Sequence, residues 1–431
     1  MKFLSRVLAA IRPSPEEMSG ELEFTKIMVD HIAGNAPPGC QVVLTGSMAK
    51  KTFLRDKRDI DIFVLFDRSF PREGLEGAVR RIMDSAFPLL EYQLSYAEHP
   101  YVRFHFEGRR IDLVPAYRIT DSSERISAVD RSVLHTDFII GALKPGQIGD
   151  VLLLKQFLRA NSLYGAEIKI QGLSGYLCEL LIVRYGSFQK LVKAASKWKE
   201  PVFIDIKGYY KGKKEVADAL SRFGSMFVMV DPTDRNRNVA AALSRENLSR
   251  LIALSREFLS APSEEFFFRT PPTFEERVAA EWGKGELYLL SMPRPEVVDD
   301  VLWGQINKLV GQLGSALKDF GPRKILPDDS RHLVRLAVIL SKGTLPPTVQ
   351  VAGPPLSMKK HVALFRASHP GSRFTSKDKK IHATLRRPVT DASDAIMRFF
   401  REYAKSRSHL SYHEEMLILE HIGRPGKKPR A

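Results

Sequence analysis

The chain has 431 residues, of which 44% are hydrophobic and 27% charged, and its formal net charge is +16. This length exceeds what one hydrophobic core supports, so we expect two to four domains. No apolar run approaches the roughly 18 residues of a membrane span, and two isolated cysteines argue against a disulfide framework or a zinc site. The composition predicts a cytoplasmic globular protein, and the basic excess predicts a polyanionic partner, either nucleic acid or a membrane surface.

Two helices are predicted before the first strand. Residues 1–12 faintly resemble a signal peptide, but no small-residue cleavage site follows, so a short amphipathic helix is expected there. Ser14 then caps a second helix, with proline at its first position and Glu17 completing a capping box. The Gly- and Pro-rich residues 34–39 end this helix.

The stretch that follows has the strongest chemical signal in the chain. An apolar strand at residues 42–44 leads into a Gly46-Ser47 turn, and a second strand is predicted from residue 59 to residue 66. Residues two apart in a strand face the same side, so Asp59 and Asp61 present two carboxylates together. Such close like charges repel, whereas Mg²⁺ takes carboxylate oxygens together with substrate phosphates.

The turn supplies groups suited to a phosphate. Glycine at position 46 lets the backbone approach a ligand closely, while the Ser47 hydroxyl and the Lys50 ammonium add a donor and a charge. The plainer interpretation is a surface turn followed by a solvated acidic pair. The combination of turn and Asp-x-Asp strand at this spacing favours a site for a divalent cation and a phosphate.

A third carboxylate lies further along the same region. After a helix through residues 79–83, strands are predicted at residues 91–97 and 101–106, followed by a short strand containing Asp112 among apolar neighbours. An unpaired charge in that setting is costly, so a salt bridge to Arg109 or Arg110 is the alternative. Together, the three aspartates have the ligands needed for two Mg²⁺ ions in a displacement at phosphorus.

The middle of the chain is predicted to be mainly helical. His135 lies just before a boundary near residue 145, and a helix from residue 150 carries Lys155 beside an apolar stripe. Tyr164 follows that helix, and Ser174 caps the next one. From the residues alone, a satisfied polar histidine, a solvated lysine and a tyrosine packed in the core remain the simpler alternatives.

A turn at residues 231–234 precedes Arg237, which is predicted to open another helix. A guanidinium suits planar recognition of a base edge or a phosphate. An ion pair between Arg237 and either Asp231 or Asp234 is an equally good interpretation.

The last region is predicted to begin at Thr273, which forms another capping box with Glu276. Strands at residues 286–292 and 332–340 flank a long helix at residues 295–320, a pattern typical of an α+β sandwich. The span 359–387 holds nine Lys or Arg residues and one acid, with Phe365 and Phe374 interleaved. A charge run is usually a solvated face, but the basic excess of the whole chain favours an RNA-binding surface here. The basic end, residues 424–430, is expected to be a flexible tail.

Several segments resemble one family. They are residues 46–66, 134–136 (LHT), 154–158 (LKQFL), 164–167 (YGAE), 172–179 (GLSGYLCE) and 231–240 (DPTDRNRNVA). The first is similar to the nucleotidyltransferase signature, and the set resembles the archaeal-type (class I) CCA-adding enzymes, which are tRNA nucleotidyltransferases. The motifs cover about the first sixty per cent of the chain, and the remainder is similar in length and character only.

This resemblance implies a multidomain α/β and α+β fold. A nucleotidyltransferase (polymerase beta-like) catalytic domain would span residues 1–145, and a mainly helical central domain would span residues 146–272. An α+β tRNA-binding body and tail region would span residues 273–431. The implied activity is template-independent addition and repair of the CCA end of tRNA from CTP and ATP, with release of pyrophosphate. The implied partner is the acceptor end of tRNA; no membrane is implied, and a homodimer is left open.

The resemblance also implies a role for each site residue. Asp59 and Asp61 would hold two Mg²⁺ ions, and Asp112 would share the catalytic one and help to activate the primer hydroxyl. The triphosphate would be bound by the Gly46 turn and by five side chains: Ser47, Lys50, His135, Lys155 and Tyr164. Arg237 would recognise the base. The family commonly has arginine where Lys50 stands, so weaker nucleotide binding is expected.

Two other functions remain to be weighed. One is a poly(A) polymerase-like or other transferase that shares the signature and adds AMP repeatedly or ignores tRNA. The other is a catalytically silent RNA-binding protein on the same fold. The three intact carboxylates argue against the silent form.

Overall fold

The computed structural model describes residues 3–96 and 100–425. Within these residues the chain forms two compact units, 1–271 and 272–431, and each is described by itself. The predicted helix start at residues 1–2, the predicted strand end at residue 97 and most of the predicted tail, residues 426–430, lie outside the described residues. In the part of the chain that is described, no helix is both long enough and apolar enough to cross a lipid bilayer.

The N-terminal unit opens with the two predicted helices, α1 (Phe3–Ile11) and α2 (Pro15–Gly34). The capping box at the start of α2 is confirmed, because Ser14 Oγ accepts the Glu17 N–H and the Glu17 carboxylate accepts the Ser14 N–H. A five-stranded mixed sheet follows, in the order β1-β2-β5-β4-β3. Its strands are β1 (Gln41–Thr45), β2 (Ile60–Phe66), β3 (Tyr92–Tyr96), β4 (Pro100–Phe106) and β5 (Arg109–Tyr117).

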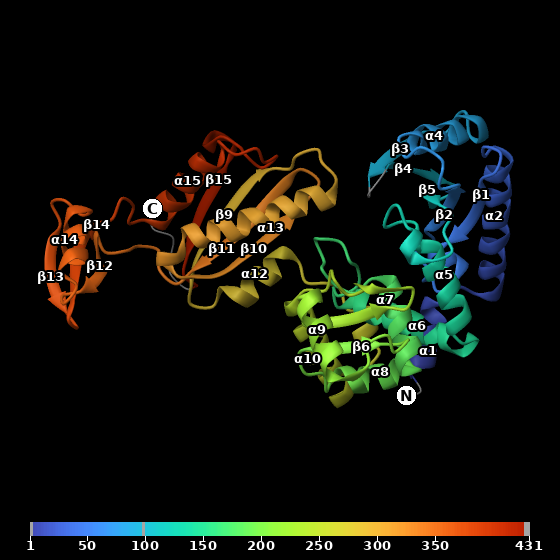
Figure 1. Ribbon diagram of the computed structural model, residues 1–431, viewed down its shortest axis with the longest axis horizontal. Coiled ribbons are helices and arrows are strands. Elements are labelled where there is room, and N and C mark those ends of the chain that lie inside the picture. Colours follow the sequence, from blue (N-terminus) through green and yellow to red (C-terminus); the bar gives the residue numbers. More distant parts are fainter. Residues whose placement is uncertain (1–2, 97–99, 426–431) are drawn as a thin grey trace. The chain divides into compact units, whose positions relative to one another are not determined.

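Alternation along β2 and β5 gives the sheet two different faces. Ile60, Ile62 and Ile111 are fully buried on the face covered by α2 and α4 (Gly74–Ala86), which lie beside the sheet in Figure 1. The alternate residues, including Asp61 and Asp112, therefore point to the opposite face. The apolar core holds the sheet on one side and leaves the carboxylates on the other.

The rest of the N-terminal unit is a helical layer with a small sheet. Its helices are α5 (Arg131–Ala142), α6 (Ile148–Ala160), α7 (Gly175–Tyr185), α8 (Phe188–Ala195), α9 (Gly212–Phe223), α10 (Arg245–Ser260) and α11 (Glu265–Phe268). The core is centred on α6, whose Phe157 lies among a cluster of phenylalanines from α8, α10 and α11. The predicted Ser174 cap of α7 is confirmed by its hydrogen bond from the Leu177 N–H.

The sequence missed a three-stranded sheet in this layer and so misplaced Arg237. The strands are β6 (Val202–Asp205), β7 (Phe227–Asp231) and β8 (Asp234–Asn238). Arg237 lies in β8, not at the start of a helix, because residues 232–233 form the turn of a β7–β8 hairpin. The Asn238 side chain then accepts N–H groups of Met229 and Ala240, and it holds the end of the hairpin.

The C-terminal unit is an antiparallel sheet between helices. The sheet order is β10-β11-β9-β15, with β9 (Glu286–Pro293), β10 (Pro322–Asp329), β11 (Leu333–Leu340) and β15 (Ile418–Gly423). Helices α13 (Asp299–Ala316) and α15 (Ala392–Tyr403) pack on one face and α12 (Phe274–Trp282) on the other. The Thr273 cap is confirmed. The predicted helix at 295–320 begins later, at Asp299, and β10 was missed.

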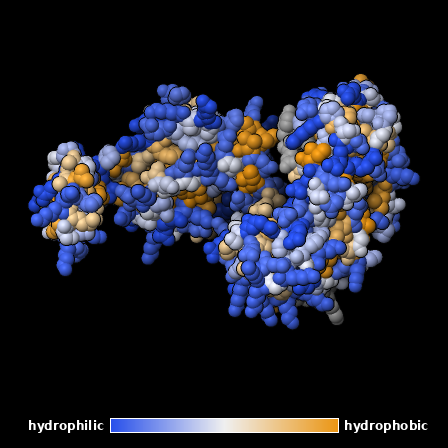
Figure 2. All heavy atoms as spheres, viewed as in Figure 1, coloured by the Kyte–Doolittle hydropathy of each residue, from blue (hydrophilic) through white to orange (hydrophobic). Residues whose placement is uncertain are grey.

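The basic span forms its own small element group in this unit. Strands β12 (Thr348–Pro355), β13 (Arg373–Lys377) and β14 (Lys380–Arg386) pair in the order β12-β14-β13, next to α14 (Lys359–Ala367). Phe365 and Phe374 pack against each other at 6.4 Å between ring centroids, while the lysines of the span are exposed. Figure 2 shows that hydrophilic residues cover most of the visible face of the molecule.

Candidate active site

The register of the central sheet brings the three predicted carboxylates together. β2 and β5 run parallel, and Asp61 lies directly opposite Asp112. Asp59 precedes the first residue of β2, so the predicted strand began one residue too early. The three residues nevertheless come from two adjacent strand starts on the same sheet.

Crowding of these charges changes the acidity of the central one. Burial raises the pKa of Asp61 to about 6, and the neighbouring Asp112 and Asp59 carboxylates add to the rise. Lys50 and Arg110 act in the opposite direction. The nearby positive groups therefore only partly offset the cost of ionising the Asp61 carboxyl in this buried position.

Arginines hold the two outer carboxylates. Arg103, the cross-strand neighbour of Asp112 on β4, donates two hydrogen bonds of 2.7 Å to its two oxygens. Arg110 pairs with Asp59 at 2.6 Å, and Arg109 turns to Glu21. The alternative partner proposed for Asp112 from sequence was thus wrong, because β5 directs Arg109 and Arg110 to other acids.

The donor set has the right chemistry for a divalent cation, but its side chains are engaged. Among residues 3–96 and 100–425, no three acidic, imidazole or thiol groups are arranged so that they hold a metal ion as they stand. Both oxygens of Asp112 accept hydrogen bonds from Arg103. A cation would have to exchange with that guanidinium, and it would relieve the repulsion that raises the pKa of Asp61.

Gly46 fits against Asp61 without space for a side chain. Its φ is +68°, a left-handed conformation, and a Cβ placed there would lie 1.9 Å from Asp61 Oδ2. The following helix, α3 (Gly46–Ala49), is a single turn. The glycine that the sequence singled out is therefore required by contact with a site carboxylate.

Lys50 and Lys155 meet at one buried carboxylate. Lys50 Nζ lies 2.5 Å from Glu179 Oε2, and Lys155 Nζ lies 3.2 Å from Glu179 Oε1. Lys155 also donates to the carbonyl and hydroxyl oxygens of Thr52. Its side chain is only 3% exposed, so the alternative of a solvated lysine was wrong. Although burial opposes ionisation of Glu179, the two ammonium groups hold its pKa below the usual value.

Tyr164 lies at the edge of the same group. Its hydroxyl is near Gly175, where a Cβ would come within 3.1 Å of it. Burial raises the pKa of this phenol, so it remains a neutral hydroxyl. Ser47 is in the single-turn helix α3, which ends just before Lys50. The backbone carbonyl oxygen of Ser47 accepts the Thr52 N–H at 2.9 Å.

His135 and Arg237 converge on a second buried carboxylate, Asp231. His135 Nε2 and Arg237 Nη1 lie 2.8 Å and 2.7 Å from the same oxygen, Asp231 Oδ2. The His135 ring also stacks on Tyr176, with 4.1 Å between centroids. Burial lowers the pKa of His135 despite its bond to Asp231, so a neutral imidazole with its proton on Nε2 fits the geometry.

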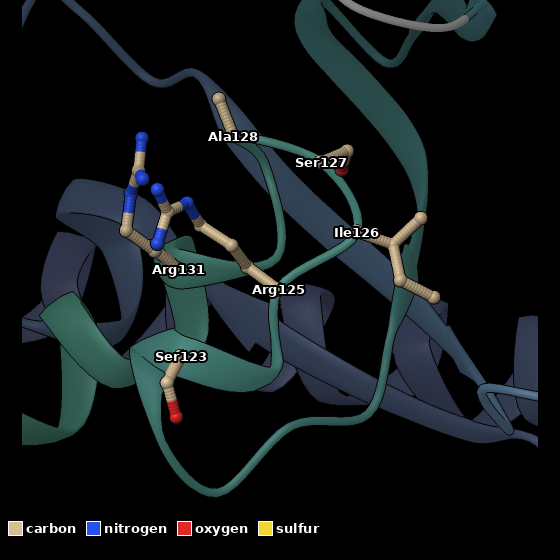
Figure 3. Close-up of a pocket in the computed structure, with 6 residues that line it drawn as sticks. All are labelled: Ser123, Arg125, Ile126, Ser127, Ala128 and Arg131. Atoms are coloured by element: carbon tan, nitrogen blue, oxygen red, sulfur yellow. The ribbon is translucent and has the colours of Figure 1, made fainter.

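Two hollows with basic walls lie in this part of the unit. One of about 520 Å³ is lined by the β8 residues Asn236 and Arg237 together with Arg125 and Arg131. The other, about 480 Å³, shares Arg125 and Arg131, whose side chains extend to the same side of it in Figure 3. Both arginines contact Asp234 Oδ2 at longer distances, 3.5 Å and 3.3 Å. The surroundings of Arg237 are thus strongly basic.

Comparison with known proteins places the chain in a family. The family model "Nucleotidyltransferase domain" matches residues 34–135, "tRNA nucleotidyltransferase, second domain" matches 149–268, and "CCA-adding enzyme, C-terminal domain" matches 285–410. The CCA-adding enzyme of Methanocaldococcus jannaschii is 41% identical over 72% of this chain and 70% of its own length. That of Methanothermobacter thermautotrophicus is 33% identical over 88% and 85%. The chain belongs to the CCA-adding enzymes. The resemblance inferred from the motifs is confirmed.

One solved structure supports the fold. A mutant of the Cid1 poly(U) polymerase, bound to MgATP, is 14% identical to this chain and has a TM-score of 0.50. The match covers 63% of this chain and 98% of that one. At this identity the likeness concerns the fold alone, and the predicted nucleotidyltransferase fold class is confirmed.

Sequence reasoning about this member of the CCA-adding enzymes did not single out three charged residues near the site: Arg103, Arg131 and Glu179. The ion pair between Arg237 and Asp231, which the sequence left open as an alternative, is confirmed at 2.7 Å. Glu179 ends one of the family motifs, and Asp231 begins another. The one available signal was the position of Glu179, a charged residue directly between apolar neighbours, Cys178 and Leu180, in the middle of a helix. Arg103 carried none, because only strand pairing places it opposite Asp112.

Proposed function

We propose that this chain adds and repairs the 3′-terminal CCA of tRNA from CTP and ATP through a single site at the starts of β2 and β5. The observation that supports this proposal most directly is that Asp61 lies opposite Asp112 in adjacent strands and that Gly46 packs against the Asp61 carboxylate. Membership of the CCA-adding enzymes supplies the substrate class. The enzymes of this family use divalent metals, and we propose Mg²⁺ here.

Asp59, Asp61 and Asp112 would hold the cations. When bound, these ions supply Lewis-acid stabilisation of charge on the reacting and leaving oxygens. Asp112 lies between Asp61 and Arg103 across the strands, and after exchange of Arg103 for a cation its carboxylate would orient the primer 3′-hydroxyl and accept its hydrogen bond. The protein contributes position and charge rather than covalent chemistry.

The triphosphate would lie along the groups beside Gly46. Lys50 and Lys155 bring two ammonium groups to one carboxylate, Glu179, which leaves a net positive charge. Ser47 and Tyr164 supply hydroxyl donors, and His135 supplies an imidazole. Arg237 would read the base, because it lines the hollow on the β8 side and presents a planar guanidinium.

The acceptor end of tRNA would be held mainly by the C-terminal unit. The exposed lysines of α14 and β14 form a basic surface suited to phosphates. A homodimer and a cytoplasmic location stay predictions.

The experiment replaces Asp59 and Asp61 singly by Ala. With Mg²⁺, labelled CTP and tRNA lacking its CCA end, each variant should lose transfer while gel-shift affinity for tRNA stays within about twofold of wild type. This follows because the phosphate contacts that give affinity lie elsewhere. Loss of tRNA affinity in parallel with activity would make the aspartates structural. Processive addition of AMP by the wild type would instead favour a poly(A) polymerase-like activity.

A further inference from the structure

Asp231 connects two residues that are proposed to bind different parts of one nucleotide. His135 on α5 and Arg237 on β8 both donate to Asp231 Oδ2. The carboxylate itself is fully buried, so it does not reach a ligand directly. Any influence it has on the nucleotide must pass through the side chains that it holds, chiefly these two.

The other oxygen of Asp231 is fixed by its own hairpin and by α7. Oδ1 accepts the N–H and the hydroxyl of Thr233 at 2.9 Å and 2.8 Å, and the hydroxyl of Tyr176 at 3.3 Å. Tyr176 also stacks against the His135 ring. One oxygen of the carboxylate is therefore anchored to the hairpin and to Tyr176. The other accepts hydrogen bonds from His135 and Arg237, the two residues proposed to bind the nucleotide.

Sharing one oxygen imposes a geometry on both donors. His135 must carry its proton on Nε2 to donate, which leaves Nδ1 turned away from Asp231. Arg237 donates a hydrogen bond from Nη1 to Asp231. This bond fixes the orientation of the guanidinium plane and so the direction of its remaining N–H groups. A rigid donor array discriminates between base edges far better than a free arginine does.

We propose that Asp231 is a positioning residue that couples triphosphate binding by His135 to base selection by Arg237 through one shared carboxylate oxygen. The proposal rests on the proposed function above. It adds a specificity-determining residue that never touches the nucleotide. A purely structural aspartate would instead affect all four nucleotides equally.

The test is single-turnover addition by Asp231→Asn of the full-length protein. The amide keeps the shape but loses the charge, and a charge-assisted hydrogen bond is worth roughly tenfold in binding. The Kd of CTP and ATP should rise about tenfold, and discrimination against UTP and GTP should fall by a similar factor, with a smaller change in the rate at saturation. Primers ending before the first C and at the second C report CTP and ATP use separately.

A double-mutant cycle separates coupling from general damage. Arg237→Ala should lose discrimination, and adding Asp231→Asn to it should reduce discrimination little further while still weakening nucleotide binding through His135. The matched control is Asp205→Asn on β6, whose carboxylate accepts the N–H groups of Gly208 and Tyr210 and contacts neither nucleotide group. Discrimination should be unchanged in that control.

Either of two results would overturn the proposal. The first is wild-type selectivity in Asp231→Asn. The second is a loss of discrimination in the double variant that equals the product of the losses in Asp231→Asn and Arg237→Ala. If Asp231→Asn does not fold by circular dichroism, Tyr176→Phe carries the test, because it removes one anchor of Oδ1 and should loosen selectivity about two- to threefold; unchanged selectivity there would equally reject the coupling. Failure of the wild type to extend tRNA at all would reject the proposed function itself and not this inference alone.

Discussion

At the residue scale, the ionised form of Asp61 is proposed to serve cation binding but lowers the stability of the folded protein. In the unfolded chain its pKa is near 3.8, whereas in the folded protein it is about 6. The folded state therefore binds more protons between these values, and this residue makes stability fall as the pH rises through that window. Above about pH 6 the full cost is present unless a cation compensates it.

Replacing Asp61 by Asn should stabilise the protein while destroying transfer. At pH 8 without divalent cations, we expect a gain of about 1–3 kcal/mol, or a few degrees in the unfolding midpoint. The gain should vanish below about pH 4. Adding Mg²⁺ should raise the midpoint of the wild type but not that of the variant. Calorimetry that shows no gain at pH 8 would mean the charges at this site do not oppose folding.

Gly46 gives a second prediction at this scale. Gly46→Ala puts a Cβ on Asp61 Oδ2, and displacement of a reacting group by about 1 Å can cost roughly 100-fold in rate. We expect such a loss in single-turnover transfer. Gly39→Ala is the control, because Gly39 has a similar positive φ, +83°, with open space around it; it should lose stability but keep activity. Equal activities in the two variants would remove the steric explanation.

The roles of individual residues were only partly readable from sequence. The pairing of Asp59 with Asp61 follows from strand periodicity, and the need for glycine follows from the turn. The partners of Asp112 and of Lys155 could not be read from the sequence, because strand register and helix packing bring together segments that lie far apart in the chain. His135 was singled out only through the family resemblance.

At the element scale, helix starts with clear capping residues were predicted, whereas several strands were missed, including β7, which is a buried apolar run. The capped helix starts at Ser14, Ser174 and Thr273 agree with the structure. β8 reads DRNRN and looks like a polar turn, yet hairpin pairing with the buried strand β7 makes it a strand. β10 contains two prolines, which argue against a strand unless it lies at an edge, as this one does in the sheet order.

The element group of α14, β13 and β14 gives the third prediction. Replacing Lys359, Lys360, Lys379 and Lys380 by Ala should weaken tRNA binding and make its salt dependence shallower. The log–log slope should fall by about 0.7–0.9 for each phosphate that the protein no longer neutralises. Nucleotide binding without tRNA should not change. Filter binding across a fourfold range of salt measures both slopes.

The matched control for this surface is Lys213→Ala with Lys214→Ala, two exposed lysines on α9. This double substitution should leave the slope nearly as in the wild type. If the slope falls by the same amount for each lysine removed in the two sets, tRNA is attracted by the net charge of the chain and not by this surface.

At the scale of the whole molecule, the sequence contains one Asp-x-Asp strand preceded by a Gly-Ser turn, whereas CCA addition uses two different nucleotides. Its fold class and family could be predicted because the signature motifs retain their spacing across the first sixty per cent of the chain. The small central sheet and the charged residues behind the site could not, since they depend on tertiary contacts. If Arg237 reads the base as proposed, use of both cytosine and adenine at one site requires that the growing RNA end change the groups that surround the incoming base.

The decisive measurement is the order of nucleotide addition to tRNA lacking its CCA end. With Mg²⁺ and all four labelled nucleotides, the wild type should add two C residues and one A and then stop, and Asp61→Asn should add none. A tRNA that ends before the first C and one that ends before the second C should each accept CTP. Only a tRNA that ends at the second C should accept ATP. Addition of A to the unextended primer, continued addition beyond the third nucleotide, or full activity in Asp61→Asn would contradict a single CCA-adding site at Asp59, Asp61 and Asp112.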